Sequence, residues 1–238
     1  MAVNDRVRQL PLSMWLPPGA SFANYVSAAN RQALAGCRAA VDGQERFVYL
    51  WGATAVGKTH LLQAACHGAT DRGAGSVYLP LRQADQFAPE ILEGLEQMAV
   101  VALDDIDAVA GQRPWEIALF DLYNRIRDRG HGALVMASRR PLAELGLALP
   151  DLQSRLAWGL VYQLQPMSDA EKHQALRRHA DERGFELPDE VGRYLLRHYH
   201  RQTGALFELL QRLDRVSLAE QRRLTIPFVK QIIDSDPE

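Results

Sequence analysis

The 238-residue sequence contains little cysteine: Cys37 and Cys66 are the two present. They do not have the close spacing of a metal-binding pair. Cys66 follows a glycine-rich loop in a stretch with a helical pattern, and Cys37 lies in an alanine-rich helical stretch. We therefore expect both to be small side chains of the core rather than reactive thiols.

Long apolar runs and an excess of positive charge are also absent. No stretch approaches the length of a membrane span, and Met1 to Arg6 lack the apolar core of a signal peptide. We therefore expect a cytoplasmic protein that does not enter a membrane.

The formal net charge of −2 argues against holding nucleic acid by bulk electrostatics, which needs clustered basic residues. We expect no direct sequence-specific DNA binding by this chain.

The most informative stretch that is present runs from Gly52 to Thr59 and matches G-x-x-x-x-G-K-[ST] at every fixed position. An apolar run precedes it and a helical pattern follows, so a strand, a phosphate loop and a helix are expected.

Gly52 and Gly57 let successive backbone N–H groups face one phosphate-sized concavity. Lys58 would reach the β- and γ-phosphates, and the Thr59 hydroxyl would ligate Mg²⁺. A chance glycine-rich turn is the alternative. The predicted nucleotide-binding residues here are Gly52, Ala53, Thr54, Ala55, Val56, Gly57, Lys58, Thr59 and His60.

Apolar runs alternate with helical patterns over most of the chain. Strands are expected at 47–51, 76–81, 99–103, 133–137 and 160–164. Helices are expected at 21–40, 58–68, 85–97 and 115–129. Strands buried on both faces and alternating with helices predict a parallel sheet with helices on each side.

After Pro166 the strand pattern stops and a small helical bundle is expected. Ser168 and Glu171 form a capping box that opens a helix to about residue 183. Further helices are expected at 188–200, at 203–221 and after Thr225. This region carries 12 Lys and Arg against 13 Asp and Glu, which favours an ion-paired, solvated surface over a DNA-binding one. The expected domains are an arm at 1–20, an α/β domain at 21–166 and a helical domain at 167–238.

Two acidic residues follow the predicted third strand. A strand that delivers a carboxylate beside a phosphate loop is where Mg²⁺ and its water are held. Asp104 is the predicted outer-sphere ligand of Mg²⁺, beside the Thr59 hydroxyl, and Asp105 is the candidate to polarise an attacking water. A solvated acidic turn is the alternative. Ser138, at the end of the fourth strand, is expected at the level of the γ-phosphate.

Arg155 precedes the last predicted strand. Such an arginine could point toward a neighbour's nucleotide, where its guanidinium would stabilise charge on the transferred phosphoryl group. Taken alone, an arginine at such a position is more often a surface residue.

The proline-rich segment from Gln9 to Pro18 cannot be helical, and its apolar side chains pack on their own domain or dock on a partner.

These residues together resemble the AAA+ module of the bacterial DnaA family, and more closely that of its shorter regulatory members, the Hda group. The motifs that carry the resemblance lie at 51–61, 103–106, 154–159 and 225–230. The resemblance covers nearly the whole chain. It implies an α/β fold, an AAA+ P-loop NTPase domain with a five-stranded parallel sheet, followed by a small all-α lid domain. An initiator would continue into a helix-turn-helix domain, whereas this sequence stops at Glu238, which favours a regulator.

The resemblance implies roles for several matching positions. Gln9, Leu10 and Leu12 correspond to the segment by which Hda binds the β sliding clamp. Phe22, Asn24 and Val26 correspond to the stretch beside the adenine, so Asn24 and Val26 join the predicted nucleotide-binding residues. Arg155 corresponds to the arginine finger that acts at the nucleotide of DnaA. The implied partners are therefore the clamp and DnaA, and a homodimer is left open.

Two positions depart from the family pattern. Arg139 stands where DnaA has an acidic residue, and Gly204 stands where the family has the sensor arginine of the lid; Arg201 lies three residues earlier. Loss of that arginine should weaken sensing of the γ-phosphate. We therefore expect ADP or another nucleoside diphosphate with Mg²⁺, and little ATPase activity of the chain's own. The alternatives are a self-contained ATPase that loads or remodels a replication protein, and an interaction module whose phosphate loop is only structural.

Overall fold

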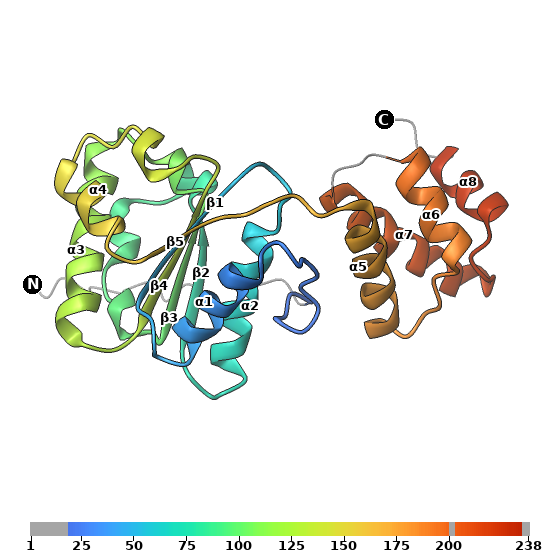
Figure 1. Ribbon diagram of the computed structural model, residues 1–238, viewed down its shortest axis with the longest axis horizontal. Coiled ribbons are helices and arrows are strands. Elements are labelled where there is room, and N and C mark those ends of the chain that lie inside the picture. The colour runs from blue at the N-terminus through green and yellow to red at the C-terminus, as the bar shows by residue number, and fades with distance from the viewer. Residues whose placement is uncertain (1–18, 200–202, 235–238) are drawn as a thin grey trace, which may run out of the picture. The chain divides into compact units, whose positions relative to one another are not determined.

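The computed structural model describes residues 19–199 and 203–234 (Figure 1). The predicted arm residues Gln9, Leu10 and Leu12, and also Arg201, lie outside these ranges. The described chain forms two compact units. The first contains the segment that ends at Phe22 together with 32–52 and 58–164, and the second contains 23–31, 53–57 and the segment that begins at Gln165.

A five-stranded sheet forms the centre of the first unit, with the order β2-β3-β4-β1-β5 and parallel pairing throughout. Its strands are β1 (Phe47–Trp51), β2 (Ser76–Pro80), β3 (Val100–Asp104), β4 (Ala133–Ser138) and β5 (Leu160–Gln163). The predicted sheet is therefore confirmed. Because all strands are parallel, their carboxyl ends meet at one edge of the sheet, which is where ligands bind in folds of this kind.

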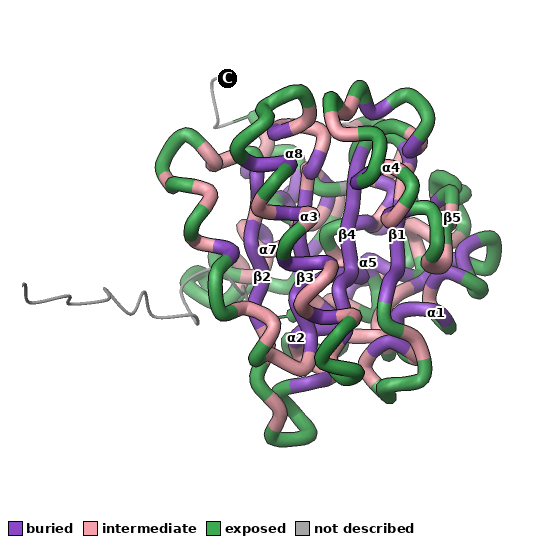
Figure 2. Tube along the Cα trace, turned by 90° about the vertical axis from the view of Figure 1, so that its left-hand side faces the viewer, coloured by how far each residue is buried: buried purple, intermediate pink, exposed green. Residues whose placement is uncertain are grey.

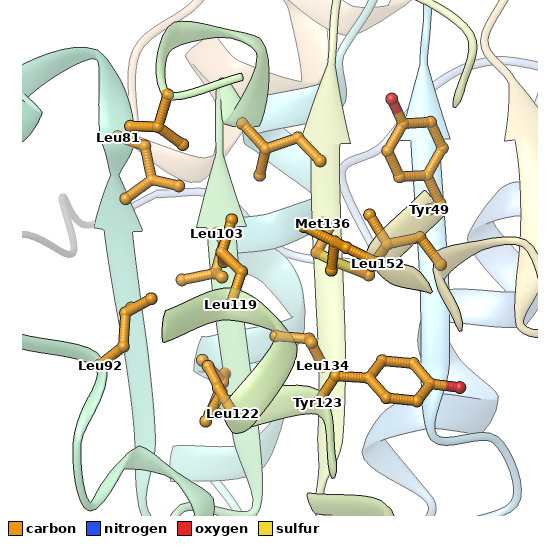
Figure 3. Close-up of a cluster of buried hydrophobic side chains, with 14 of the residues drawn as sticks. Tyr49, Leu81, Leu92, Leu103, Leu119, Leu122, Tyr123, Leu134, Met136 and Leu152 are labelled. Atoms are coloured by element: carbon orange, nitrogen blue, oxygen red, sulfur yellow. The ribbon is translucent and has the colours of Figure 1, made fainter. Parts of the chain in front are cut away.

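Helices cover both faces of this sheet (Figure 1). One face carries α1 (Arg31–Val41) and α2 (Lys58–Thr70), and the other carries α3 (Arg113–Arg129) and α4 (Pro150–Leu156). Figure 3 shows the core beneath α3 and α4, where leucines and aromatic rings of the helices meet those of the strands. The central strands are buried along their length, while β5 alternates between half-buried and exposed residues, because it lies at an edge (Figure 2). Both cysteines are buried, as predicted.

The helix predicted at 21–40 is wrong in its first half. The helix begins at Arg31, and residues 22–30 form turns and irregular backbone. Two polar groups of this segment bond to side chains of α5 (Asp169–Glu182). The Ala28 N–H donates to Glu171 at 2.6 Å, and the Asn24 amide donates to Glu182 at 2.7 Å. Tertiary hydrogen bonds thus override the helical periodicity of the sequence.

The helix predicted at 85–97 is also wrong. Short 3-10 helices take its place at Leu81–Gln86, Pro89–Leu92 and Leu95–Gln97. Pro89 lacks an N–H and holds Ala88 extended, and Gly94 has a φ of 76°. These two residues interrupt the α-helix that the apolar spacing suggests.

The second unit contains a helical bundle. It consists of α5, α6 (Asp189–His198), α7 (Thr203–Glu220) and α8 (Ile226–Asp234), packed around a leucine-rich core. The predicted capping box is confirmed: Ser168 accepts from the Glu171 N–H, and Glu171 accepts from the Ser168 N–H. Among the described residues, no helix combines the length and the apolar character that crossing a bilayer requires.

Candidate functional site

The loop that joins β1 to α2 has the backbone conformation that its glycines allow. Gly52 has a φ of 153° and Gly57 a φ of 99°, and Ala55 also has a positive φ, of 63°. Gly57 is required for a second reason. A Cβ at this position would lie 2.8 Å from the ring of Tyr25. The loop is therefore held in a tight curve, as a phosphate-binding loop must be.

Lys58 and Ser138 lie where the loop meets the sheet. Trp51, the last residue of β1, pairs with Ser138 at the end of β4, and the Gly52 N–H donates to the Ser138 carbonyl at 3.2 Å. The Lys58 ammonium donates to the Gly52 carbonyl at 2.8 Å. Burial lowers the pKa of Lys58, and the field of Asp104 opposes this shift. The first turn of α2 thus places a buried ammonium beside the carbonyl of Gly52, the residue that opens the motif.

Asp104, the last residue of β3, is 3% exposed and is surrounded by donors. Its carboxylate accepts from the Thr59 hydroxyl at 2.6 Å, from the Tyr78 hydroxyl at 2.9 Å and from the Asp105 N–H at 3.0 Å. Burial raises the pKa of Asp104, while the hydrogen bond from Thr59 works in the opposite direction. The structure thus brings together Thr59 and Asp104, the two residues predicted to hold Mg²⁺.

Asp105 and Asp107 are each held by an arginine. Arg82 donates two hydrogen bonds to Asp105, at 3.1 and 3.3 Å, and Asp105 has a left-handed backbone. Arg139 donates to Asp107 at 2.8 Å, and Ser138 also donates to Asp107, at 3.2 Å. Burial acts to raise the pKa of Asp107, but the bonds from Arg139 outweigh it and the pKa is lowered. The predicted water-polarising residue, Asp105, therefore already has a cationic partner.

These oxygen groups fit a magnesium ion held through one hydroxyl and one carboxylate. Mg²⁺ is usually bound by one or two carboxylates plus phosphates and water, rather than by an all-protein cage. In keeping with this, the described residues contain no group of three or more His, Cys, Asp or Glu side chains placed to hold a metal. Thr59 and Asp104 would hold the ion, which would supply charge for the phosphates of a bound nucleotide.

The other residues predicted near the nucleotide fall in both units. His60 lies in the first, where its Nε2 is 2.9 Å from the Ser21 carbonyl. Asn24 and Val26 lie in the second, where Asn24 is bonded to Glu182 and Val26 is buried. Their contact with a base stays a prediction.

Arg155 lies in the last turn of α4, a helix that the sequence reading missed. Leu152 and Leu156 of this helix are buried in the core. Within the described chain the Arg155 guanidinium forms no hydrogen bond or ion pair, and it lies over the Trp158 ring, 5.4 Å from the ring centroid. Its five N–H donors are therefore available to a ligand or partner. We name the segment 150–159 the Arg155 corner.

Glu116 supports the Arg155 corner from inside the unit. This carboxylate is fully buried and accepts from the Gly111 N–H at 2.7 Å, the Ala148 N–H at 3.0 Å and the Leu149 N–H at 2.8 Å. Leu149 immediately precedes α4. Sequence reasoning missed both Glu116 and Tyr78. Glu116 sits at a buried position of an otherwise apolar helix stripe, a signal that could have found it, whereas the role of Tyr78 depends on strand pairing.

Residues 16–163 match the family profile of the bacterial DnaA ATPase domain. The chain belongs to the bacterial DnaA ATPase family. Residues 169–233 match a second profile, described as the Hda lid domain. The chain is thus a DnaA-like AAA+ protein in which a P-loop domain, the class of domain that binds nucleotides, is followed by a lid of the Hda type.

Solved structures of DnaA share this fold. Domain III of the replication initiation protein DnaA from Thermotoga maritima matches with a TM-score of 0.77 at 19% identity, over 92% of this chain and 97% of that one. AMPPCP-bound DnaA from Aquifex aeolicus matches with a TM-score of 0.68 at 23% identity, over 84% of this chain and 66% of that one. A replication initiator DnaA bound to AMPPCP and single-stranded DNA matches with a TM-score of 0.67 at 21% identity, over 84% of this chain and 66% of that one. This chain thus spans slightly less than two thirds of the length of those two proteins.

Proposed function

We propose that this chain regulates the initiation of chromosome replication by stimulating hydrolysis of the ATP bound to DnaA, which gives inactive DnaA–ADP. In this proposal Arg155 acts in trans as an arginine finger. Gln9, Leu10 and Leu12 bind the β sliding clamp. The loop from Gly52 to Thr59 holds ADP with Mg²⁺, and the protein works in the cytoplasm without binding specific DNA sequences itself.

The state of Arg155 is the observation that carries this proposal. Asp104, Asp105 and Asp107 at the carboxyl edge of the sheet have side-chain partners, but the Arg155 guanidinium has no hydrogen bond or ion pair among the described residues. Its helix is nevertheless anchored by Leu152 and Leu156. A fixed backbone that presents an unpaired guanidinium suits a group that stabilises charge on a phosphoryl group supplied by another molecule.

The test is Arg155→Ala in an assay of DnaA-bound ATP hydrolysis with the clamp loaded on DNA. We expect stimulation to fall by about 10³-fold or more, the usual effect of removing an arginine finger, while ADP and clamp binding stay normal. Arg113→Ala is the matched control, because Arg113 is an exposed arginine at the start of α3 in the same unit. Stimulation that survives in Arg155→Ala would exclude the finger.

The clamp contact has a separate test. Gln9→Ala combined with Leu10→Ala should abolish capture of the protein by the immobilised β clamp and leave ADP binding unchanged. This outcome is expected because two apolar anchors and one amide would supply most of the contact in an extended peptide of this length. Equal capture of the double variant and the wild type would exclude the arm as the clamp ligand.

A second candidate is a self-contained ATPase that loads or remodels a replication protein. The preserved set of Lys58, Thr59 and Asp104 favours it, since these groups are the ones that a hydrolysing P-loop site needs. The ion pair between Asp105 and Arg82 favours the regulator, because it occupies the residue expected to polarise water. Turnover of ATP by the purified chain without any partner discriminates the two: a loader hydrolyses ATP, and the regulator hardly does so.

A further inference from the structure

Trp158 is the aromatic residue of the Arg155 corner, and its exposure is unusual. It is 74% exposed, while Trp115 of α3 is buried in the core. Large aromatic side chains are normally buried over most of their surface, because each removes a large apolar area from water. Core packing therefore does not explain a tryptophan at position 158.

Trp158 and Arg155 form a pair at the end of α4. The backbone N–H of Trp158 donates to the Arg155 carbonyl at 3.1 Å, and this bond closes the last turn of the helix. The Arg155 guanidinium lies over the indole at 5.4 Å from the ring centroid. This distance is within the limit of about 6 Å for a cation–π interaction, and tryptophan is the aromatic residue that binds cations best.

The backbone that carries this pair is fixed on both sides. Leu156, between the two residues, is 2% exposed. Gly159, which follows Trp158, packs against β1 so closely that a Cβ there would lie 2.8 Å from the Phe47 carbonyl carbon and closer still to its oxygen. The corner can therefore move little, and the direction of the Arg155 side chain depends chiefly on its contact with Trp158.

We propose that Trp158 is a positioning residue for Arg155. Its indole face holds the guanidinium extended, so that the side chain loses less rotamer freedom when it meets a phosphate group. A cation–π contact uses no hydrogen-bond acceptor, so the N–H donors of the guanidinium stay available to a phosphate group. This inference rests on the proposed function of Arg155 and adds a residue to it.

The main test titrates each variant into the assay of DnaA-bound ATP hydrolysis. For Trp158→Ala we expect a maximal stimulated rate about two- to fivefold lower, with the half-saturating concentration unchanged, because an exposed cation–π contact is weak and acts on orientation rather than on docking. Trp158→Phe should keep most of the rate, since a phenyl face also binds cations. Ile117→Ala, which removes another exposed apolar side chain, should match the wild type.

Two results would overturn the inference. One is a wild-type maximal rate in Trp158→Ala. The other is an unchanged maximal rate with a raised half-saturating concentration, which would make Trp158 a docking contact. Arg155→Ala runs beside these variants. If it loses stimulation while Trp158→Ala does not, the inference fails and the proposed function stands; if Arg155→Ala stimulates normally, the proposed function fails and this role of Trp158 fails with it.

A second measurement examines the pair without any partner protein. The chain has four tryptophans, so labelling with 5-fluorotryptophan gives a ¹⁹F spectrum in which Trp158→Phe identifies the resonance of Trp158. Arg155→Ala should shift that resonance and leave those of Trp51 and Trp115 in place, whereas Arg113→Ala should shift none of the three. A Trp158 resonance that is unaffected by Arg155→Ala would show that the ring does not hold the guanidinium.

Discussion

At the carboxyl edge of the sheet, Asp104, Asp105 and Asp107 all have partners within the first unit, whereas the Arg155 guanidinium at the end of α4 has no hydrogen-bond or ion-pair partner among the described residues. Both places belong to the first unit. The edge thus satisfies these three carboxylates internally. The Arg155 corner instead presents a guanidinium that has no such partner. The comparison suggests that the edge holds a ligand and that the corner acts on another molecule.

The largest effect is expected when the Arg155 corner loses its internal support. Glu116→Ala leaves three backbone N–H groups without their buried acceptor, and we expect the free energy of unfolding to fall by about 3–5 kcal/mol. Urea denaturation measures this loss. Glu144→Ala, at an exposed position before α4, should change it by less than about 0.5 kcal/mol. A loss in Glu116→Ala no larger than in the control would mean that Glu116 does not hold the corner.

The next largest effect is the stabilisation expected when a nucleotide binds at the carboxyl edge of the sheet. ADP with Mg²⁺ at about 100 times its Kd should stabilise the wild type by about 2.7 kcal/mol, which raises the melting temperature by about 5–10 °C. Lys58→Ala should abolish this rise, because it removes the ammonium beside the Gly52 carbonyl. Lys172→Ala, in the helical bundle, should keep it. An equal rise in Lys58→Ala would leave the phosphate loop a structural element only.

A smaller and pH-dependent effect is expected for the ion pair of Asp107. Because Arg139 lowers the pKa of Asp107, the pair stabilises the fold above the pKa of the unfolded aspartate, about 3.9, and this contribution disappears as the pH falls through the folded pKa. Arg139 is half exposed, so Arg139→Ala should cost about 1 kcal/mol at pH 7 and less at pH 2. Unfolding curves at the two pH values measure the difference. A cost that is the same at both values would contradict the assignment.

The smallest effect is expected at the corner itself. Arg155→Ala should change the free energy of unfolding by less than about 0.5 kcal/mol, since the side chain has only a weak cation–π contact to lose. Chemical denaturation beside Arg113→Ala checks this. A loss of 2 kcal/mol or more would mean that Arg155 supports its own fold, and the contrast between edge and corner would be lost.

The parallel sheet was predictable because its strands are continuous apolar runs, and all five strands lie within one residue of their expected ends. The phosphate loop was predictable because its glycines and its lysine have fixed spacing. The segments 22–30 and 85–97 were not predictable from periodicity. Hydrogen bonds donated to distant residues such as Glu171 hold the first out of a helix, and Pro89 breaks the second.

The candidate site was predictable only in part. Lys58, Thr59 and Asp104 could be found from local motifs, and the structure brings them together. Tyr78 could not, because it reaches Asp104 only through the pairing of β2 with β3. The partners of Asp105 and Asp107 were missed for the same reason. The arginines that pair with these two carboxylates are distant in sequence, and they come near only through the order of the strands in the sheet.

The contact between Tyr25 and Gly57 has a practical consequence for anyone who would transplant this loop into another scaffold. The eight residues of the motif carry their own glycines, but the ring that lies against Gly57 comes from a turn outside the motif, where the Asn30 amide donates to the Tyr25 hydroxyl. A graft of the motif alone would leave that supporting ring behind. A graft that retains the curvature would have to include the turn that holds Tyr25.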